Sequence, residues 1–255
     1  MLQGLRSKFY GSRLYDFSLG GRPVSPSASP PSLWSKAITS RANENDFHWL
    51  GALDVPNDPL DIGEARHRLL AWWNANWRWR SDTWRADLIG DRLTHLLIHF
   101  DALLTDAHDL FKSRLKISLN RQARHLFRIP LLPRTQADAF KIWRGRVFAA
   151  LFLPKYRPRL VGAVGEMIEG IPGHIFPDGG HFSRSPQMQI ECLATLVHIR
   201  ATLEAVSAEV PEVLQGAIDR MTPMVRTFLH ADGALAAFNA SDGGDTDAIV
   251  RVLEM

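Results

Sequence analysis

From residue 61 onward the chain repeats one pattern: an apolar stripe at helical spacing, a proline or glycine, and then another stripe. Residues 84–104 show it most clearly, because their large apolar side chains recur every three or four positions, as on the buried face of an α-helix. The members of this stripe are Ile89, Leu93, Leu96, Leu97, Phe100 and Leu104. Strand signals are almost absent, so the pattern predicts an all-α protein.

Prolines and glycines divide this region into about eight helices with short connections. The predicted helices cover residues 64–80, 84–104, 108–129, 136–153 and 159–171, with others beginning at Pro186 and Pro211 and a short last one over 246–254. Short connections between successive helices predict an array of antiparallel αα-hairpins. Such an array can stack as a solenoid or close into an α/α toroid, and periodicity alone does not choose between them.

The first 45 residues read differently from the rest. The run Pro23–Ser32 is rich in proline and serine, which disfavour a helix. We therefore predict an irregular N-terminal arm or linker over residues 1–45 and one helical domain over residues 46–255. No apolar run is long enough for a signal peptide or a membrane span, so a cytoplasmic chain is expected as the sequence stands. Cys192 is the only cysteine, which excludes an internal disulfide.

Charge is distributed unevenly although the net charge is only +3. The segment Lys112–Arg159 holds thirteen Lys and Arg and the single acid Asp138, whereas Leu160–Met255 holds five Arg and thirteen acids. The basic band is typical of a protein with an anionic partner, such as an acidic polysaccharide, a nucleic acid or a membrane surface. The alternative, which we favour, is a set of solvated helix faces whose charges balance in space. No nucleic-acid-binding motif accompanies the band, so a nucleic acid is not expected as partner.

Histidine and tryptophan gather in two stretches. His95 and His99 have a zinc-compatible spacing, but the third ligand and the glutamate of a zinc protease are missing, which favours structural histidines and no metal. Five tryptophans crowd together, and most are expected in the core because indoles pack between helices. They are Trp72, Trp73, Trp77, Trp79 and Trp84. Phosphate-loop, GxGxxG, CxxC and GxSxG motifs are absent, so no cofactor is expected.

One strongly loop-like insert, residues 172–185, interrupts the helices. It ends on Ser185 and Pro186, a preferred N-cap followed by a preferred first helical residue. The segment Asp178–Pro186, DGGHFSRSP, resembles the DGGHFERSP segment of heparinase II/III-type polysaccharide lyases, and Val147–Leu153 resembles the helix before it. The stretches Trp84–Leu104 and Ile218–Asn239 resemble the alphaproteobacterial branch of the same family.

The resemblance implies an incomplete α/α toroid that is followed in the family by a β-sandwich and that cleaves acidic polysaccharides by β-elimination. That chemistry needs a neutralised uronate carboxylate, a base and an acid. The family's tyrosine and histidine fall on Met188 and Gln189, and its Asn-His pair falls near Ala137 and Asp138. The resemblance therefore implies a lyase that is incomplete or inactive on its own, with the family's β-sandwich as a packing partner. It also implies a periplasmic location if a leader precedes this sequence.

Within this hypothesis His181 is the candidate catalytic residue, and its alternative role is to fix the loop by hydrogen bonds. The candidate substrate-binding residues are Arg184, Asp178, Trp77, Trp79 and His230. Arg184 could bind a uronate or pair with an acid of the protein, and His230 could shape a groove rim or cap a helix. The second hypothesis is a non-catalytic helical scaffold that binds a glycan or a protein.

Overall fold

The computed structural model describes residues 45–53, 59–130, 139–231, 233–239, 241, 249 and 252–254. Every element in these ranges is helical, apart from the isolated bridges Ile175–His181 and Leu229–Leu235. The order is η3 His48–Leu53, α2 Pro59–Ala75, α3 Ala86–Ile98, α4 Phe100–Leu104, α5 Asp109–Leu126, α6 Ala139–Phe152, η4 Pro154–Arg159, α7 Leu160–His174, α8 Pro186–Ala205 and α9 Glu212–Thr227. The prediction of an all-α protein is confirmed.

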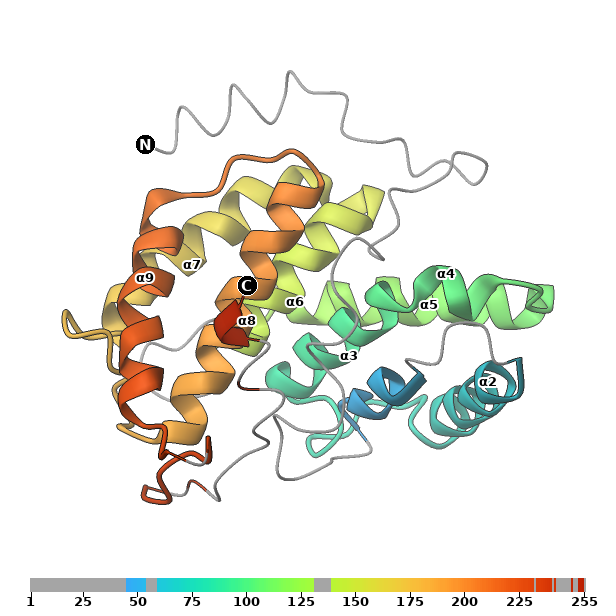
Figure 1. Cartoon of the computed structure of the whole chain (residues 1–255). Helices are drawn as coiled ribbons and strands as arrows, with labels where there is room; N and C mark the ends of the chain where they lie inside the picture. Colours follow the sequence, from blue (N-terminus) through green and yellow to red (C-terminus); the bar gives the residue numbers. More distant parts are fainter. Residues whose placement is uncertain are drawn as a thin grey trace.

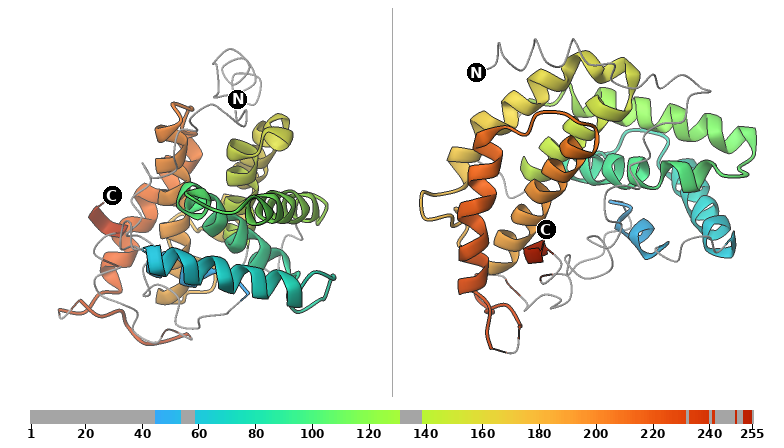
Figure 2. Two further views of the ribbon diagram at one scale, coloured as in Figure 1. Left: turned by 90° about the vertical axis from the view of Figure 1, so that its right-hand side faces the viewer. Right: turned by 45° about the horizontal axis from the view of Figure 1, so that its top comes forward.

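The helices α3 and α6 form the centre of the molecule and share its most extensive helix contact. Figure 1 shows α2, α4 and α5 on one side of this pair and α7, α8 and α9 on the other. Figure 2 shows α2 lying across from α5, which it also contacts. Closure into an α/α toroid stays a prediction, as does the division at residue 45, because residues 1–44 lie outside the described part.

Two glycines let α3 and α6 approach backbone to backbone. A Cβ on Gly90 would collide with the carbonyl oxygen of Lys141, and a Cβ on Gly145 would collide with the Cα of Gly90. Beside this contact the fully buried guanidinium of Arg144 pairs with Asp91, with 2.6 Å between Nη2 and Oδ1. Burial lowers the pKa of Arg144, and the carboxylate of Asp91 opposes that effect. The centre of the fold is therefore fixed both by shape and by a buried charge pair.

Several predicted helix boundaries are wrong. The first helix begins at Pro59 instead of residue 64, and α7 continues through Pro172 to His174. The first helix ends at Ala75 instead of residue 80, since the Asn76 side chain donates to the Trp72 carbonyl (3.0 Å) and closes the last turn. Trp77 and Trp79 thereby leave the helix. The stripe over residues 84–104 is also interrupted: α3 ends before His99, whose φ is −92° and ψ 15°, and α4 follows. A ring nitrogen of His99 hydrogen-bonds the carbonyl of His95 (2.8 Å) at this break.

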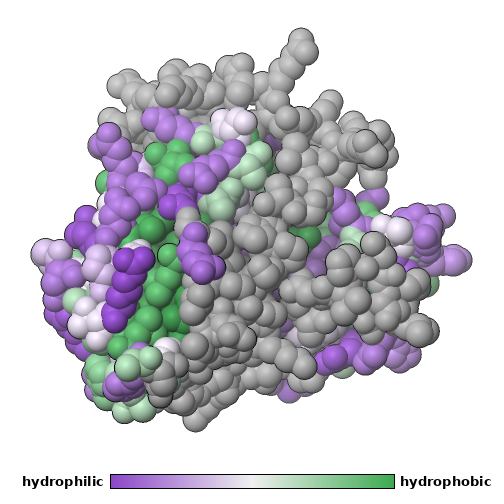
Figure 3. All heavy atoms as spheres, in the orientation of Figure 1, coloured by the Kyte–Doolittle hydropathy of each residue, from purple (hydrophilic) through white to green (hydrophobic). Residues whose placement is uncertain are grey.

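The predicted start of α8 is confirmed. Ser185 is its N-cap and its hydroxyl accepts from the backbone N–H of Met188, while Pro186 occupies the first helical position. On the face drawn in Figure 3, hydrophobic residues come to the surface between α8 and α9 and are flanked by hydrophilic residues along the outer side of α9. Among the described helices, none combines the length and apolar character needed to cross a membrane.

Candidate functional site

The loop between α7 and α8 carries the motif that drew attention in the sequence, and we call residues 175–185 the His181 loop. Its two arms are joined by the Ile175–His181 bridge and by a bond from the N–H of Phe182 to the carbonyl of His174 (2.9 Å). Gly179 adopts a φ of +84°, and a Cβ there would collide with the carbonyl of Arg220 on α9. A glycine is required at this position because the loop presses its backbone directly onto α9.

His181 is fully buried inside this loop. Its backbone N–H donates to Oε1 of Gln189 (2.6 Å), and Nε2 of Gln189 donates to the carbonyl of Gly179 (2.8 Å). The ring nitrogen Nδ1 hydrogen-bonds the hydroxyl of Ser183 (2.8 Å). Burial, and secondarily the nearby His174, lower the pKa of His181 to about 4. The imidazole is therefore neutral at pH 7 and enclosed by protein.

The two charged residues of the loop satisfy one another. Arg184 Nη1 lies 2.9 Å from Oδ2 of Asp178, and the other carboxylate oxygen accepts from the N–H of Gly180 (2.8 Å). That N–H, followed by Arg184, lowers the pKa of the Asp178 carboxyl. The Arg184 guanidinium also covers the ring of Phe176 at 4.7 Å. Both charges are thus used within the loop, at its exposed surface, where such a pair contributes little to stability.

Gln189 is the residue of this region that sequence reasoning undervalued. It stands where the resembling family has a histidine, and it was judged only by the chemistry it cannot perform. Its side chain is almost completely buried and forms hydrogen bonds to the backbone of both His181 and Gly179. A buried glutamine early in a largely apolar helix was the available signal, since buried amides require partners.

The tryptophan cluster divides between core and surface. Trp73 and Trp84 are buried and Trp72 is half-buried. Trp77 and Trp79 are 55% and 60% exposed, although indoles usually bury most of their area. The candidate residues Trp77 and Trp79 therefore lie at the surface, in the segment that leaves α2.

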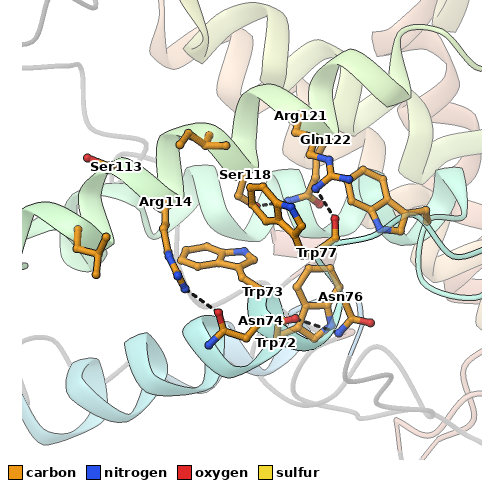
Figure 4. Close-up of a pocket in the computed structure, with 13 residues that line it drawn as sticks. Trp72, Trp73, Asn74, Asn76, Trp77, Ser113, Arg114, Ser118, Arg121 and Gln122 are labelled. Atoms are coloured by element: carbon orange, nitrogen blue, oxygen red, sulfur yellow. Dashed lines mark hydrogen bonds between the residues drawn. The ribbon is translucent and has the colours of Figure 1, made fainter.

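Trp77 lines a groove between the end of α2 and the helix α5, which we call the Trp77 groove. Its volume is about 550 Å³. An adjoining hollow of about 490 Å³ shares Trp77, Ile117 and Arg121 with it. The groove is lined by Trp72, Trp73, Asn74, Asn76, Trp77, Trp84, Leu110, Ser113, Arg114, Ile117, Ser118, Arg121 and Gln122. Figure 4 shows the Trp73 ring between the two helices and Arg114 reaching from α5 toward Asn74.

Arg121 organises the groove wall. Its guanidinium lies 4.9 Å from the ring centroid of Trp77 and 4.8 Å from that of Trp84, and Nη1 donates to the Trp77 carbonyl. Stacking between two indoles holds a cation without neutralising it, because the ring faces carry no net charge. Trp77 is thereby fixed beside a permanent positive charge, although it lies outside any helix.

The basic band of the sequence separates into two parts. Within α6, Arg144 and Lys141 pair with Asp91, and Arg146 pairs with Glu166, so these cations are structural. On α5, no acidic side chain of the described residues pairs with Arg114, Lys116 or Arg121, and neither hollow has an Asp or Glu in its lining. The α6 cations thus meet acids of α3 and α7, whereas on α5 only Lys112 lies near an acid of the described residues, at 3.6 Å from Asp109. Solvated helix faces whose charges balance in space stay a prediction for the band as a whole.

The remaining candidates lie elsewhere. His230 is exposed beyond α9, and its backbone forms a turn with Ala234 and Gly233; Asp232 lies outside the described residues, as do Ala137 and Asp138. His95 is buried against His48, with 5.5 Å between ring centroids. Within the described ranges, no group of three His, Cys, Asp or Glu side chains is placed to hold a metal ion. The structure does not bring His181, Trp77 and His230 into one hollow; ligand binding by the six candidate residues stays a prediction.

Comparison with known proteins bears on the family. The chain matches no protein-family model and no solved structure. It is 29% identical over 206 residues to the FtsZ-localized protein C of Caulobacter vibrioides (strain NA1000 / CB15N). The aligned part covers 81% of this chain and 35% of that relative, so the chain spans about a third of the relative's length.

This likeness overturns the assignment to heparinase II/III-type lyases. The relative is named for FtsZ and not for a polysaccharide, and no lyase family matches the chain. The assignment started from the loop motif DGGHFSRSP and added three weaker likenesses in the helices. The members of the loop motif are used here to pack and cap the polypeptide. The predicted lyase activity, the acidic polysaccharide partner and the glycan-binding scaffold were wrong with it, and the expected β-sandwich partner loses its basis.

Proposed function

We propose that this chain is a helical, protein-binding scaffold of the bacterial cell-division machinery and that it associates with FtsZ. The observation that carries the proposal is the likeness to FtsZ-localized protein C, which extends over 81% of the chain. Such coverage extends far beyond an isolated motif. Of the two hypotheses drawn from the sequence, the protein-binding form of the scaffold is the one that agrees with this relative.

Two features of the structure support a scaffold. The His181 loop, where the chemistry of a lyase was expected, uses its polar groups to join α7, α8 and α9. The Trp77 groove, by contrast, presents aromatic and cationic side chains to the surface. Polar groups that are satisfied internally stabilise the fold, whereas exposed aromatic and arginine side chains are the groups most enriched in protein interfaces.

The proposal is tested with the full chain as it stands. Purified FtsZ of Caulobacter vibrioides is immobilised, and binding of the chain is followed by biolayer interferometry, with an unrelated helical protein as control. Saturable binding is expected. In cells of the same bacterium, a fluorescent fusion of the chain is expected to coincide with labelled FtsZ. A fusion that stays uniformly distributed, together with no binding to the FtsZ surface, would contradict the proposal.

A further inference from the structure

We propose that the Trp77 groove is the docking site for an acidic segment of a protein partner, with an apolar side chain seated on the tryptophan and carboxylates meeting the cations of α5. This inference rests on the proposed function, because it names the surface that would carry the association. It also assigns a role to the basic band of α5, which neither the fold nor the His181 loop uses.

The apolar part of the groove is exposed at a cost. Leu110 and Ile117 lie two turns apart on the same face of α5, and their side chains are 62% and 51% exposed. Trp77 faces them from beyond the end of α2 and is 55% exposed. Burying apolar surface is worth roughly 25 cal/mol per Å², so three such side chains around one hollow form a favourable seat for an apolar anchor.

The charged part of the groove is positive only. Arg114 and Arg121 are seven residues apart and share one side of α5, and Lys116 lines only the adjoining hollow. Neither hollow has an Asp or Glu among its described lining residues. Arg121 is already held by two indoles and one carbonyl, so little side-chain entropy is lost when a carboxylate binds it. Guanidinium groups bind carboxylates in a bidentate geometry, which makes an acidic segment the complementary ligand.

The shape of the site favours a polypeptide segment over a lipid surface or a second copy of this chain. Trp77, Leu110 and Ile117 line one hollow. Its other lining residues come from α2, from α5 and, between α2 and α3, from Asn76 and Trp84. Figure 4 shows labelled residues of both helices around this hollow. A narrow chain enters such a hollow, whereas a bilayer contacts what protrudes. Apolar anchors flanked by charges are how short segments are recognised in helical grooves.

The test compares variants of the full chain on immobilised FtsZ of Caulobacter vibrioides. Ile117→Glu places a negative charge on the apolar seat and is expected to weaken binding at least about 10-fold. Arg114→Glu reverses one wall charge and is expected to weaken binding by about the same factor, and more strongly at low salt than at high salt. Ile117 is half-exposed, and the side chain of Arg114 donates to exposed Asn74. Both variants are therefore expected to fold, which circular dichroism checks.

The matched control is Phe238→Glu, the same kind of change at an exposed aromatic residue that packs on Phe228, away from α2 and α5. It is expected to bind within about 2-fold of the unaltered chain. If the unaltered chain binds and the folded groove variants bind equally well, the docking site is wrong while the proposed function stands. If the unaltered chain itself does not bind, the proposed function fails and the docking site with it.

Two other occupants are checked directly. Sedimentation with vesicles of phosphatidylglycerol and phosphatidylethanolamine, and light scattering over a range of concentrations, are run on the unaltered chain and on Ile117→Glu. Vesicle binding or a dimer that is abolished by Ile117→Glu would assign the groove to a lipid surface or to a second copy, and would overturn the proposal. Neither is expected.

Discussion

The His181 loop and the Trp77 groove hold most of the conspicuous polar and aromatic residues, and the two regions use them in opposite ways. In the loop, Asp178 pairs with Arg184, and His181 is buried and bonded to Gln189 and Ser183. In the groove, no acid of the described residues pairs with the cations, which lie beside half-exposed apolar side chains. Within the loop, the charged groups pair with one another and Nε2 of His181 is buried without a hydrogen-bond partner among the described residues, whereas the groove leaves charged groups at the surface.

The difference teaches that a dense motif is a weak guide to chemistry. Glycine, histidine, serine and proline in close succession can be required by a tight loop, a buried turn and a helix cap, as they are here. The groove has no motif, since its lining comes from α2, α5 and the segment between α2 and α3. Its binding properties follow from cations and apolar side chains that the described residues around them neither pair nor bury.

The largest expected effect separates two neighbouring tryptophans. Trp73→Ala should lower the free energy of unfolding by about 4 kcal/mol, because it removes a buried indole that packs on Phe111. Trp77→Ala should lower it by less than about 1 kcal/mol, because that ring is more than half exposed. Urea unfolding measures both. A large loss for Trp77→Ala would make the groove part of the core and would break the comparison.

A smaller loss is expected in the loop. Gly179→Ala should cost about 3 kcal/mol, since a side chain is strained at a φ of +84° and its Cβ would meet the backbone of Arg220. The matched change Gly180→Ala should cost less than half as much, because its Cβ meets the movable end of the Arg184 side chain. Thermal unfolding of the two variants measures both losses of stability. Equal losses would mean that the backbone of Gly179 is not packed against α9.

The smallest of these effects depends on pH. His181 has a pKa of about 4 in the folded chain and about 6.5 when unfolded, so only the unfolded state takes up a proton between those values. Its contribution is zero above pH 6.5 and lowers the free energy of unfolding by about 2 kcal/mol at pH 5. The variant His181→Asn should therefore lose less stability than the unaltered chain between pH 7 and pH 5, as measured by urea midpoints. Equal losses would indicate an imidazole that is protonated when folded, as an exposed ligand-binding residue would be.

Several parts of the fold were predictable because they depend on neighbouring residues only. The all-α class follows from apolar spacing, and the start of α8 follows from Ser185 and Pro186, whose preferences act over one helical turn. The end of α2 and the break at His99 were missed because single side chains, Asn76 and His99, decide them by bonding a carbonyl of the preceding turn. A side chain that bonds to the backbone in this way leaves only a weak signal in the spacing of apolar residues.

The groove could be predicted only in fragments. The sequence singled out Trp77 and the basic band, but it did not place them together, and it favoured charges that balance in space. In α6 the arginines meet Asp91 of α3 and Glu166 of α7. In α5, Arg121 meets the ring of Trp77, and no acid of the described residues pairs with it.

By itself the sequence determined that this chain forms helices, where most of them lie and how α8 begins, because those outcomes depend on side chains within a few residues of one another. The tertiary structure decided which polar groups are left to interact with something else. It buried His181 at a pKa of about 4 and, among the residues that the structure describes, gave the arginines of α5 no acidic partner. Burial and pairing depend on neighbours that are distant in sequence, and they set both the charge of an imidazole and the partner of a guanidinium.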